Sequence, residues 1–182
     1  MFKRALLVLC CVASAHAAPS HQAADDIERF LADRGVVDHM EQLRQSVGGK
    51  ASELVLNAMS FLGVPYRRGG TNAETGFDCS GFVRSMYEQT IGLVLPRKAR
   101  DQAAATETID RNDLQPGDLV FFNTMRQSFS HVGIYLGDNK FIHSPKPGQR
   151  VRVEDMRQAY WERRFTGARR VTGTSVKEKP SE

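Results

Sequence analysis

The chain has 182 residues, and its 25 basic and 21 acidic side chains give a net charge of +4. Lys3 and Arg4 supply two of the basic charges, so residues 18–182 carry 23 basic against 21 acidic side chains, a net charge of +2. No basic run is dense enough to indicate nucleic-acid binding, although a weak positive charge suits an anionic polymer. About 165 residues suffice for one domain with a sizeable core.

Residues 1–17 have the three parts of a secretory signal peptide. Two basic residues precede the apolar run at residues 5–13, and the Ala-His-Ala sequence at 15–17 has the small-x-small pattern of a cleavage site. As a helix, this run would span about 14 Å against a bilayer core of roughly 30 Å, so we expect no transmembrane segment in the mature chain. No small residue precedes Cys10 or Cys11, which disfavours lipidation. We expect an exported protein.

Helical spacing of apolar residues appears twice before the middle of the chain. In residues 18–49 the spacing continues until Gly48-Gly49, which predicts an N-terminal helical extension whose function the sequence does not reveal. In residues 51–62, Ser52 is a candidate start signal. The apolar side chains of this second segment lie on one face: Leu54, Ala58, Phe61 and Leu62.

A third helix is predicted to begin at Cys79. Residues 63–76 are rich in Gly, Pro, Thr and Asn and predict a loop that leads to the sequence FDCSGF at 77–82. Asp78 suits the N-cap position, where its carboxylate would accept backbone N–H bonds from the first turn. The residues that recur with Cys79 at helical spacing are Phe82, Val83, Met86 and Thr90.

The second half of the chain changes to a strand pattern. Short β-branched or aromatic runs separated by turn signals predict strands of an antiparallel sheet. They are residues 118–122, 131–137 and 140–144, followed by a helical stretch at 160–165 and a last strand at 167–171. Residues 172–182 are polar enough to predict a disordered tail. The chain is therefore expected to have an α+β fold in a single domain.

Without the signal peptide, Cys79 is the only cysteine, so no disulfide within the mature chain is possible. A small buried hydrophobe is the ordinary interpretation of a lone cysteine. A nucleophile needs its thiol ionised, and lowering the pKa by three units requires about 4 kcal/mol. A helix dipole supplies at most about 2 kcal/mol, so an imidazolium must also be near.

Two of the five histidines lie in the predicted sheet and are the candidates to activate the thiol. With a three-residue turn at 137–139, His143 pairs opposite Gly133 and shares a face with His131. A two-residue turn would place His143 opposite Ile134, on the other face. The first register predicts a relay in which His131 accepts the proton of Cys79 and His143 orients His131.

Five motifs in this order resemble the NlpC family of papain-like peptidoglycan endopeptidases. They are FDCSGFV, LPRKARDQ, LQPGDLVFF, SHVGIYLGDNKFIHSP and YWERRFTGARRV, within residues 50–171. The resemblance implies a papain-like fold in which the helix that starts at Cys79 packs on an antiparallel sheet. It implies a catalytic domain at residues 50–171, no metal and no cofactor.

The resemblance also implies roles for single residues. Cys79 corresponds to the nucleophile, His131 to the general base and His143 to the third polar member. Tyr66 matches a tyrosine that lines the cleft. Asp78 and Ser80 belong to the DCSG signature, where we favour a helix cap and a first-turn polar residue while allowing contact with substrate. Arg97 and Gln102, in LPRKARDQ, could bind stem-peptide carboxylates, although a structural role is favoured.

The implied substrate is peptidoglycan in the periplasm or cell envelope of a bacterium. The chain looks most like the MepS/Spr type, which suggests a DD-endopeptidase that cuts cross-links. Three alternatives remain open: an amidase that cuts the glycan-to-peptide bond, a wall-binding module without activity, and a zinc site. The zinc site would use Cys79, His131 and His143, although they lack the short paired spacing typical of such sites.

Overall fold

The computed structural model describes residues 49–124 and 127–172. The expected signal peptide at 1–17, the N-terminal extension except residue 49, and the tail except residue 172 lie outside the described residues. The helices are α3 (Lys50–Ser60), α4 (Cys79–Thr90), α5 (Ala99–Ala104), η1 (Arg111–Asp113) and α6 (Ala159–Glu162). The strands are β1 (Thr71–Asn72), β2 (Gly76–Phe77), β3 (Glu107–Ile109), β4 (Leu119–Phe122), β5 (His131–Gly137), β6 (Lys140–His143), β7 (Arg152–Asp155) and β8 (Phe165–Arg170).

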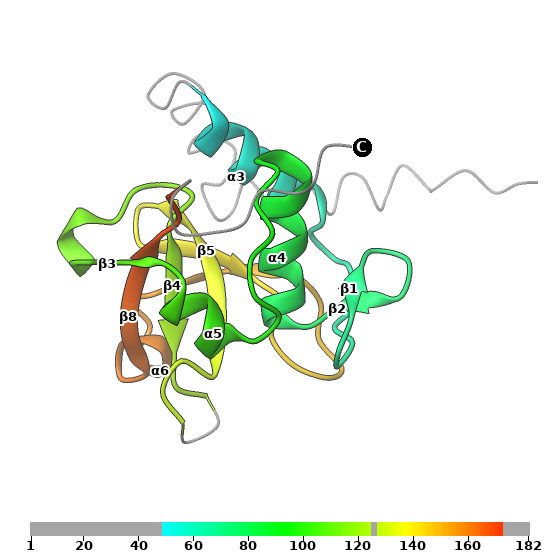
Figure 1. Cartoon of the computed structure of the whole chain (residues 1–182). Coiled ribbons are helices and arrows are strands. Elements are labelled where there is room, and N and C mark those ends of the chain that lie inside the picture. The colour runs from blue at the N-terminus through cyan, green and yellow to red at the C-terminus, as the bar shows by residue number, and fades with distance from the viewer. Residues whose placement is uncertain (1–48, 125–126, 173–182) are drawn as a thin grey trace, which may run out of the picture. The chain divides into compact units, whose positions relative to one another are not determined.

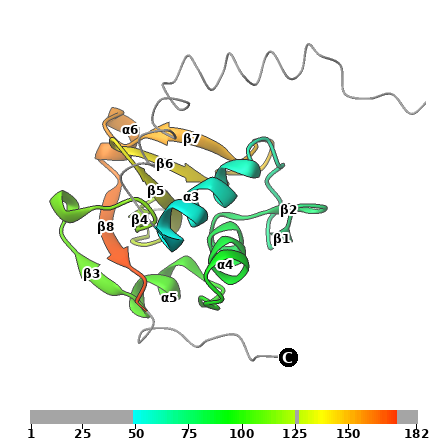
Figure 2. The ribbon, with the colours of Figure 1, turned by 90° about the horizontal axis from the view of Figure 1, so that it is seen from above.

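Six strands form one antiparallel sheet in the order β3-β8-β4-β5-β6-β7. Helix α4 runs beside this sheet and contacts β5 and β6, while α3 lies next to α4 and the β1–β2 hairpin lies beyond α4 (Figures 1 and 2). The expected α+β fold with a helix on an antiparallel sheet is therefore confirmed. None of the helices in the described ranges is both long and apolar enough to cross a membrane.

The register between β5 and β6 is the predicted one, but the turn is not. Ile134 pairs with Ile142 and Tyr135 with Phe141. The same register, continued by one residue, places Gly133 opposite His143. The turn itself has two residues, Asp138 and Asn139, both with positive φ. An irregularity between Tyr135 and Gly137 adds one residue to β5. Our expectation that a two-residue turn would turn His143 to the other face was wrong, because this bulge restores the alternation.

Helix α4 begins at Cys79 as its local sequence predicts. The Asp78 carboxylate accepts a hydrogen bond from the backbone N–H of Gly81 at 2.8 Å, so Asp78 is the N-cap. In α3 the prediction was less accurate: the helix starts after Gly49, and Ser52 lies inside it and is not the cap. The residues that α3 buries are Leu54, Val55, Ala58 and Met59.

Both faces of the central strands are buried. One face carries a cluster formed by Val120, Phe122, Tyr135, Phe141, Met156 and Trp161. The alternate residues of the same strands are also buried: Leu119, Phe121, Val132, Ile134 and Ile142. This explains why β4 and β5 read as nearly continuous apolar runs in the sequence. The predicted helix at 160–165 is shorter, because Phe165 already begins β8.

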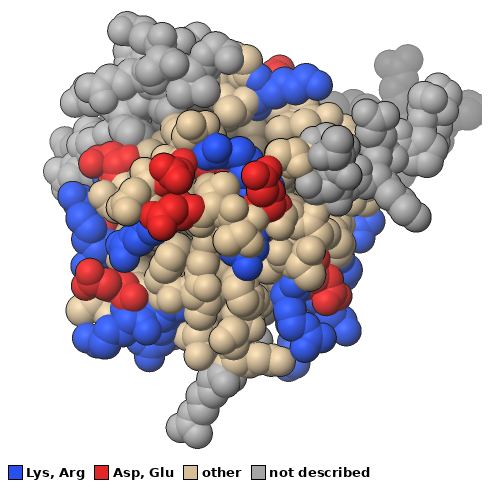
Figure 3. All heavy atoms as spheres, turned by 60° about the vertical axis from the view of Figure 1, so that its left-hand side comes forward, with Lys and Arg blue, Asp and Glu red and all other residues tan. Residues whose placement is uncertain are grey.

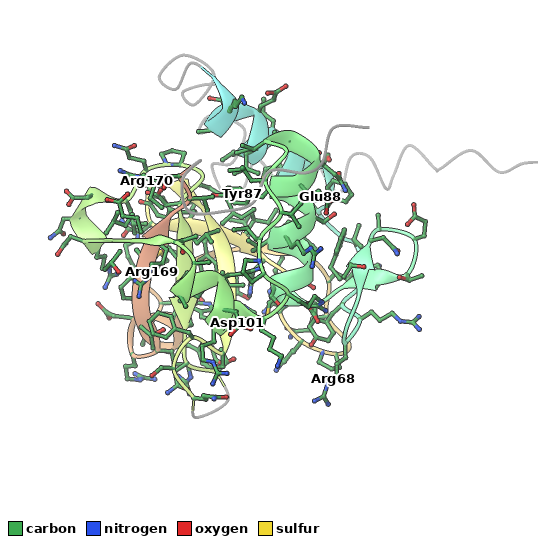
Figure 4. The ribbon with its side chains drawn as sticks, viewed as in Figure 1. Arg68, Tyr87, Glu88, Asp101, Arg169 and Arg170 are labelled. Atoms are coloured by element: carbon green, nitrogen blue, oxygen red, sulfur yellow. The ribbon has the colours of Figure 1, made fainter. Side chains whose placement is uncertain are left out.

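Polar contacts tie the helices to the strands. The Tyr87 hydroxyl, which points from α4 toward the sheet, donates to the Gly117 carbonyl at 2.5 Å (Figure 4). At the end of β8, the Arg170 guanidinium donates to both carboxylate oxygens of Asp118, at 2.9 and 2.7 Å. On the face shown in Figure 3, basic and acidic side chains are interspersed. These contacts join the C-terminal half of α4 and the end of β8 to the segment that leads into β4.

Candidate active site

The thiol of Cys79 lies where the first turn of α4 meets β5. The backbone N–H groups of Val132, Ser80 and Cys79 are near its sulfur and favour the thiolate. Cys79 is partly exposed and free. It lines a cleft of about 560 Å³ together with His131. The other residues around this cleft are Tyr66, Thr124, Ser130, Pro145, Lys146, Pro147, Gln149, Arg152, Glu154, Gln158, Tyr160 and Trp161.

The structure brings the two sheet histidines into contact. Nε2 of His131 lies 2.6 Å from Nδ1 of His143, a short hydrogen bond, and the two rings are nearly perpendicular at 87°. Both residues are almost completely buried, at 3% and 0% exposure. Because Nε2 of His131 is occupied, Nδ1 is the nitrogen that remains for another partner.

Gly133 makes the histidine pair possible. A Cβ atom at this position would lie 2.7 Å from Cδ2 of Phe141 and 3.2 Å from Cβ of His143. Such contacts are too close, so any larger residue would displace the strand that carries His143. The space above Gly133 is therefore filled by the side chains of Phe141 and His143 from β6.

Aromatic rings enclose the imidazoles. Trp161 of α6 stacks on His131 at 5.7 Å between ring centroids and meets the edge of His143 at 5.2 Å. Phe141 lies 4.8 Å from His143 by the same measure. This apolar surround removes water from the ring faces and fixes the rotamers of both histidines.

Burial controls the protonation of these groups. It raises the pKa of the Cys79 thiol to about 11, and the Asp78 carboxylate adds to the rise, against the backbone N–H groups that lower it. Burial lowers the pKa of His131 well below 6.5, and His143 lowers it further. It also lowers the pKa of His143, although Glu154 acts in the opposite direction. Taken one at a time, the groups are neutral at neutral pH, contrary to our expectation of an ionised thiol.

Asp78, Ser80 and Arg97 bind one another. The Arg97 guanidinium donates to both carboxylate oxygens of Asp78, at 2.9 and 2.5 Å, and to the Ser80 hydroxyl at 3.0 Å. The amide of Gln102 donates to the carbonyls of Ser80 and Pro96, at 3.0 and 2.9 Å. These contacts give all four polar side chains a structural role, as favoured for LPRKARDQ.

Tyr66 lines the same cleft as Cys79. Its backbone N–H donates to the carbonyl of Gln149 at 2.8 Å, which fixes this part of the loop. The pKa of its hydroxyl is raised, first by burial and then by the nearby Cys79 and Asp78. The position agrees with the prediction that a tyrosine lines the cleft.

Sequence reasoning missed Glu154, Arg152 and Trp161. The Glu154 carboxylate accepts hydrogen bonds from the Arg152 guanidinium at Oε1 and from the Trp161 indole at Oε2, and Oε1 lies 3.8 Å from Nε2 of His143. Burial by itself raises the pKa of Glu154, but His143, Arg152 and Trp161 outweigh it and hold the pKa at about 2. The alternation of charged residues with Val151 and Val153 was the available signal for β7.

The histidine geometry bears on the zinc alternative. Two nitrogens bound to one zinc ion at about 2.0–2.1 Å in a tetrahedral site lie about 3.3 Å apart. Nε2 of His131 and Nδ1 of His143 are closer, at 2.6 Å, and point at each other. Within the described ranges, no group of three His, Cys, Asp or Glu side chains is placed to hold a metal ion.

Comparison with known proteins points to one family. The profile of the NlpC/P60 family matches residues 63–170. Murein DD-endopeptidase MepH of Escherichia coli is 35% identical over 173 residues, which cover 87% of this chain and 64% of that protein. The chain thus spans less than two thirds of the length of MepH.

Two further relatives extend the comparison. Murein DD-endopeptidase MepS/Murein LD-carboxypeptidase of E. coli is 37% identical over 138 residues, 76% of this chain and 71% of that protein. The crystal structure of an NlpC/P60 family protein from Bacillus cereus superposes with a TM-score of 0.62 and 36% identity. That match covers 66% of this chain and 39% of the other.

Proposed function

Because the chain belongs to the NlpC/P60 family, we propose that it is an exported cysteine peptidase that hydrolyses amide bonds in peptidoglycan, with the DD cross-link as its substrate. The observation that carries the proposal is a cleft lined by the Cys79 thiol at a helix start and by His131, which is hydrogen-bonded to the buried His143. Two of the relatives are named as murein DD-endopeptidases, which supports this choice of bond. The catalytic domain is residues 50–171, behind a signal peptide at 1–17.

The first step is attack by Cys79 on the amide carbonyl. The thiol proton passes to Nδ1 of His131, because Nε2 already bonds to His143. The transfer leaves a positive charge on the imidazole of His131 and a negative charge on the attacked carbonyl group. The net charge of the site therefore does not change. Oxygen of the carbonyl becomes an oxyanion, and the backbone N–H of Cys79 at the start of α4 is placed to stabilise it.

Breakdown of the tetrahedral intermediate releases the amine. The imidazolium of His131 donates its proton to the departing nitrogen, and the acyl group stays on Cys79 as a thioester. Water, deprotonated by the same imidazole, then attacks the thioester and restores the thiol. Throughout both steps His143 holds His131 by the 2.6 Å hydrogen bond.

The lining of the cleft suits a peptide. It includes the polar Lys146, Gln149 and Arg152 and the aromatic Tyr66 and Tyr160. Stem peptides offer both carboxylates and aliphatic side chains to such a surface. Asp78 and Ser80 are hydrogen-bonded to Arg97 next to Cys79 and remain candidates for contact with the peptide.

The test is digestion of isolated sacculi and of defined muropeptides by the purified protein. Cross-linked dimers should give monomers of the masses expected for cleavage at the DD bond. Release of intact stem peptides from glycan would identify an amidase, and loss of a terminal residue alone would identify a carboxypeptidase. No product of any kind with folded protein would contradict the proposal.

The matched variants are Cys79→Ala and Cys79→Ser. Each should lower turnover by roughly 10³-fold or more, because no other nucleophile replaces the thiol. Their melting temperatures should stay near that of the wild-type protein, since the changes are small. Cleavage that persists in both variants would show that the nucleophile lies elsewhere.

A further inference from the structure

Glu154 is a buried carboxylate that faces the far side of the histidine pair. Its side chain is 12% exposed, and β7 places it on the same face of the sheet as His143. Arg152 holds one carboxylate oxygen and Trp161 the other. With its low pKa, this group is an anion fixed in position beside His143, and it also lines the cleft.

The second nitrogen of His143 faces this anion. Nε2 of His143 has no hydrogen-bond partner in the part of the chain that the structure describes, and it lies 3.8 Å from Oε1 of Glu154. This distance exceeds that of a hydrogen bond, but the ring is fully buried and the Glu154 side chain is only 12% exposed, so solvent screens their attraction weakly. A proton on Nε2 is therefore favoured, and a lone pair there is repelled.

The position of this one proton fixes every other proton in the pair. A neutral imidazole carries a single N–H, so a proton on Nε2 of His143 leaves Nδ1 as an acceptor. The 2.6 Å contact then requires His131 to donate from Nε2. His131 consequently has a bare lone pair on Nδ1. The opposite arrangement would leave a proton on Nδ1 of His131 and no base for the thiol.

We propose that Glu154 is a positioning residue that sets the tautomers of His143 and His131, so that Nδ1 of His131 can accept the proton of Cys79. The role of these tautomers in catalysis rests on the proposed function. The tautomers themselves can be measured without substrate, so the test does not depend on that function. When Sγ loses its proton to Nδ1, the imidazolium gains a negative partner beyond His143. No other reactant is needed.

Glu154→Gln removes the negative charge that favours a proton on Nε2 of His143. The single amide oxygen cannot accept from both Arg152 and Trp161, which bind opposite carboxylate oxygens in the wild type. In either amide orientation the anion beside Nε2 of His143 is lost, so the form with protons on Nδ1 of both rings gains population.

The experiment is nitrogen NMR of the histidine rings in the full chain at pH 7.5, for the wild-type protein and for Glu154→Gln. We expect protons on Nε2 of both rings in the wild type and a larger fraction protonated on Nδ1 of both rings in the variant. The kcat for muropeptides should fall roughly tenfold or more with little change in KM, as expected when a general base is less often available. Asp155→Asn, on the same strand but paired with Arg157, should leave spectrum and kcat unchanged.

Two results would overturn the proposal. One is a wild-type spectrum with the proton of His143 on Nδ1, which needs no variant to fold. The other is an unchanged tautomer pattern in folded Glu154→Gln. If the wild-type tautomers are as proposed but no muropeptide is cleaved, the proposed function fails and the role of Glu154 in fixing the tautomers stands.

Discussion

The protonation state of Cys79 in the free protein leads to a measurable prediction. Burial and the Asp78 carboxylate raise the thiol pKa to about 11, and burial keeps His131 neutral. At pH 7 a thiol with this pKa is about one part in 10⁴ ionised, whereas an ordinary thiol of pKa about 8.5 is a few per cent ionised. A preformed thiolate and imidazolium pair would instead be fully reactive at pH 7.

The assay is the rate of alkylation by iodoacetamide between pH 6 and pH 10, compared with a small free thiol. Only the thiolate reacts, so the rate for Cys79 should rise about tenfold per pH unit over the whole range. The free thiol should level off near its own pKa. The slope, unlike the absolute rate, does not depend on how easily the reagent enters the cleft.

His131→Ala supplies the control. If the thiol is neutral in the free protein, this variant keeps the steep pH dependence. If an ion pair exists, the wild type shows a flat, fast rate from pH 6 to 8 that the variant loses. That plateau would refute our conclusion that proton transfer awaits the substrate, and circular dichroism at each pH would verify that the fold persists.

Two further substitutions test the structure around the site. Gly133→Ala should lower the free energy of unfolding by about 1–3 kcal/mol and reduce murein cleavage, because its Cβ meets Phe141 and His143; unchanged melting and unchanged activity would contradict this. Asp78→Asn should move the alkylation profile of the thiol to lower pH and cost about 1 kcal/mol of stability, because it removes a nearby negative charge and half of the Arg97 pair. A shift to higher pH would contradict the stated cause of the raised pKa.

Local signals in the sequence were enough to locate the start of α4. An acceptor side chain at Asp78 followed by helical spacing of apolar residues fixes both the cap and the first residue, Cys79. Alternation along β5 and β6 likewise predicted that His131 and His143 share a face. These features depend on neighbours within one turn or one hairpin, which a sequence displays directly.

The bulge at Leu136 could not be predicted in the same way. A two-residue turn with a bulge and a three-residue turn without one give the same register, so the sequence does not distinguish them. The position of Glu154 beside His143 was not predicted, for a different reason. Its strand carries charged residues on the side that faces the histidines, and only tertiary contacts with Arg152 and Trp161 explain their burial.

The site's charges explain how so many ionisable groups can be buried beside the apolar cluster. Cys79, His131 and His143 are neutral when no substrate is bound, and the carboxylates of Glu154 and Asp78 have Arg152 and Arg97 as counter-ions. The free protein therefore avoids the desolvation cost of a buried, unpaired charge. Separated charge arises only after a carbonyl group reaches the sulfur. At that moment the start of α4 faces the oxyanion and the carboxylate lies behind the imidazolium, so stabilisation is concentrated in the transition state, where it accelerates the reaction.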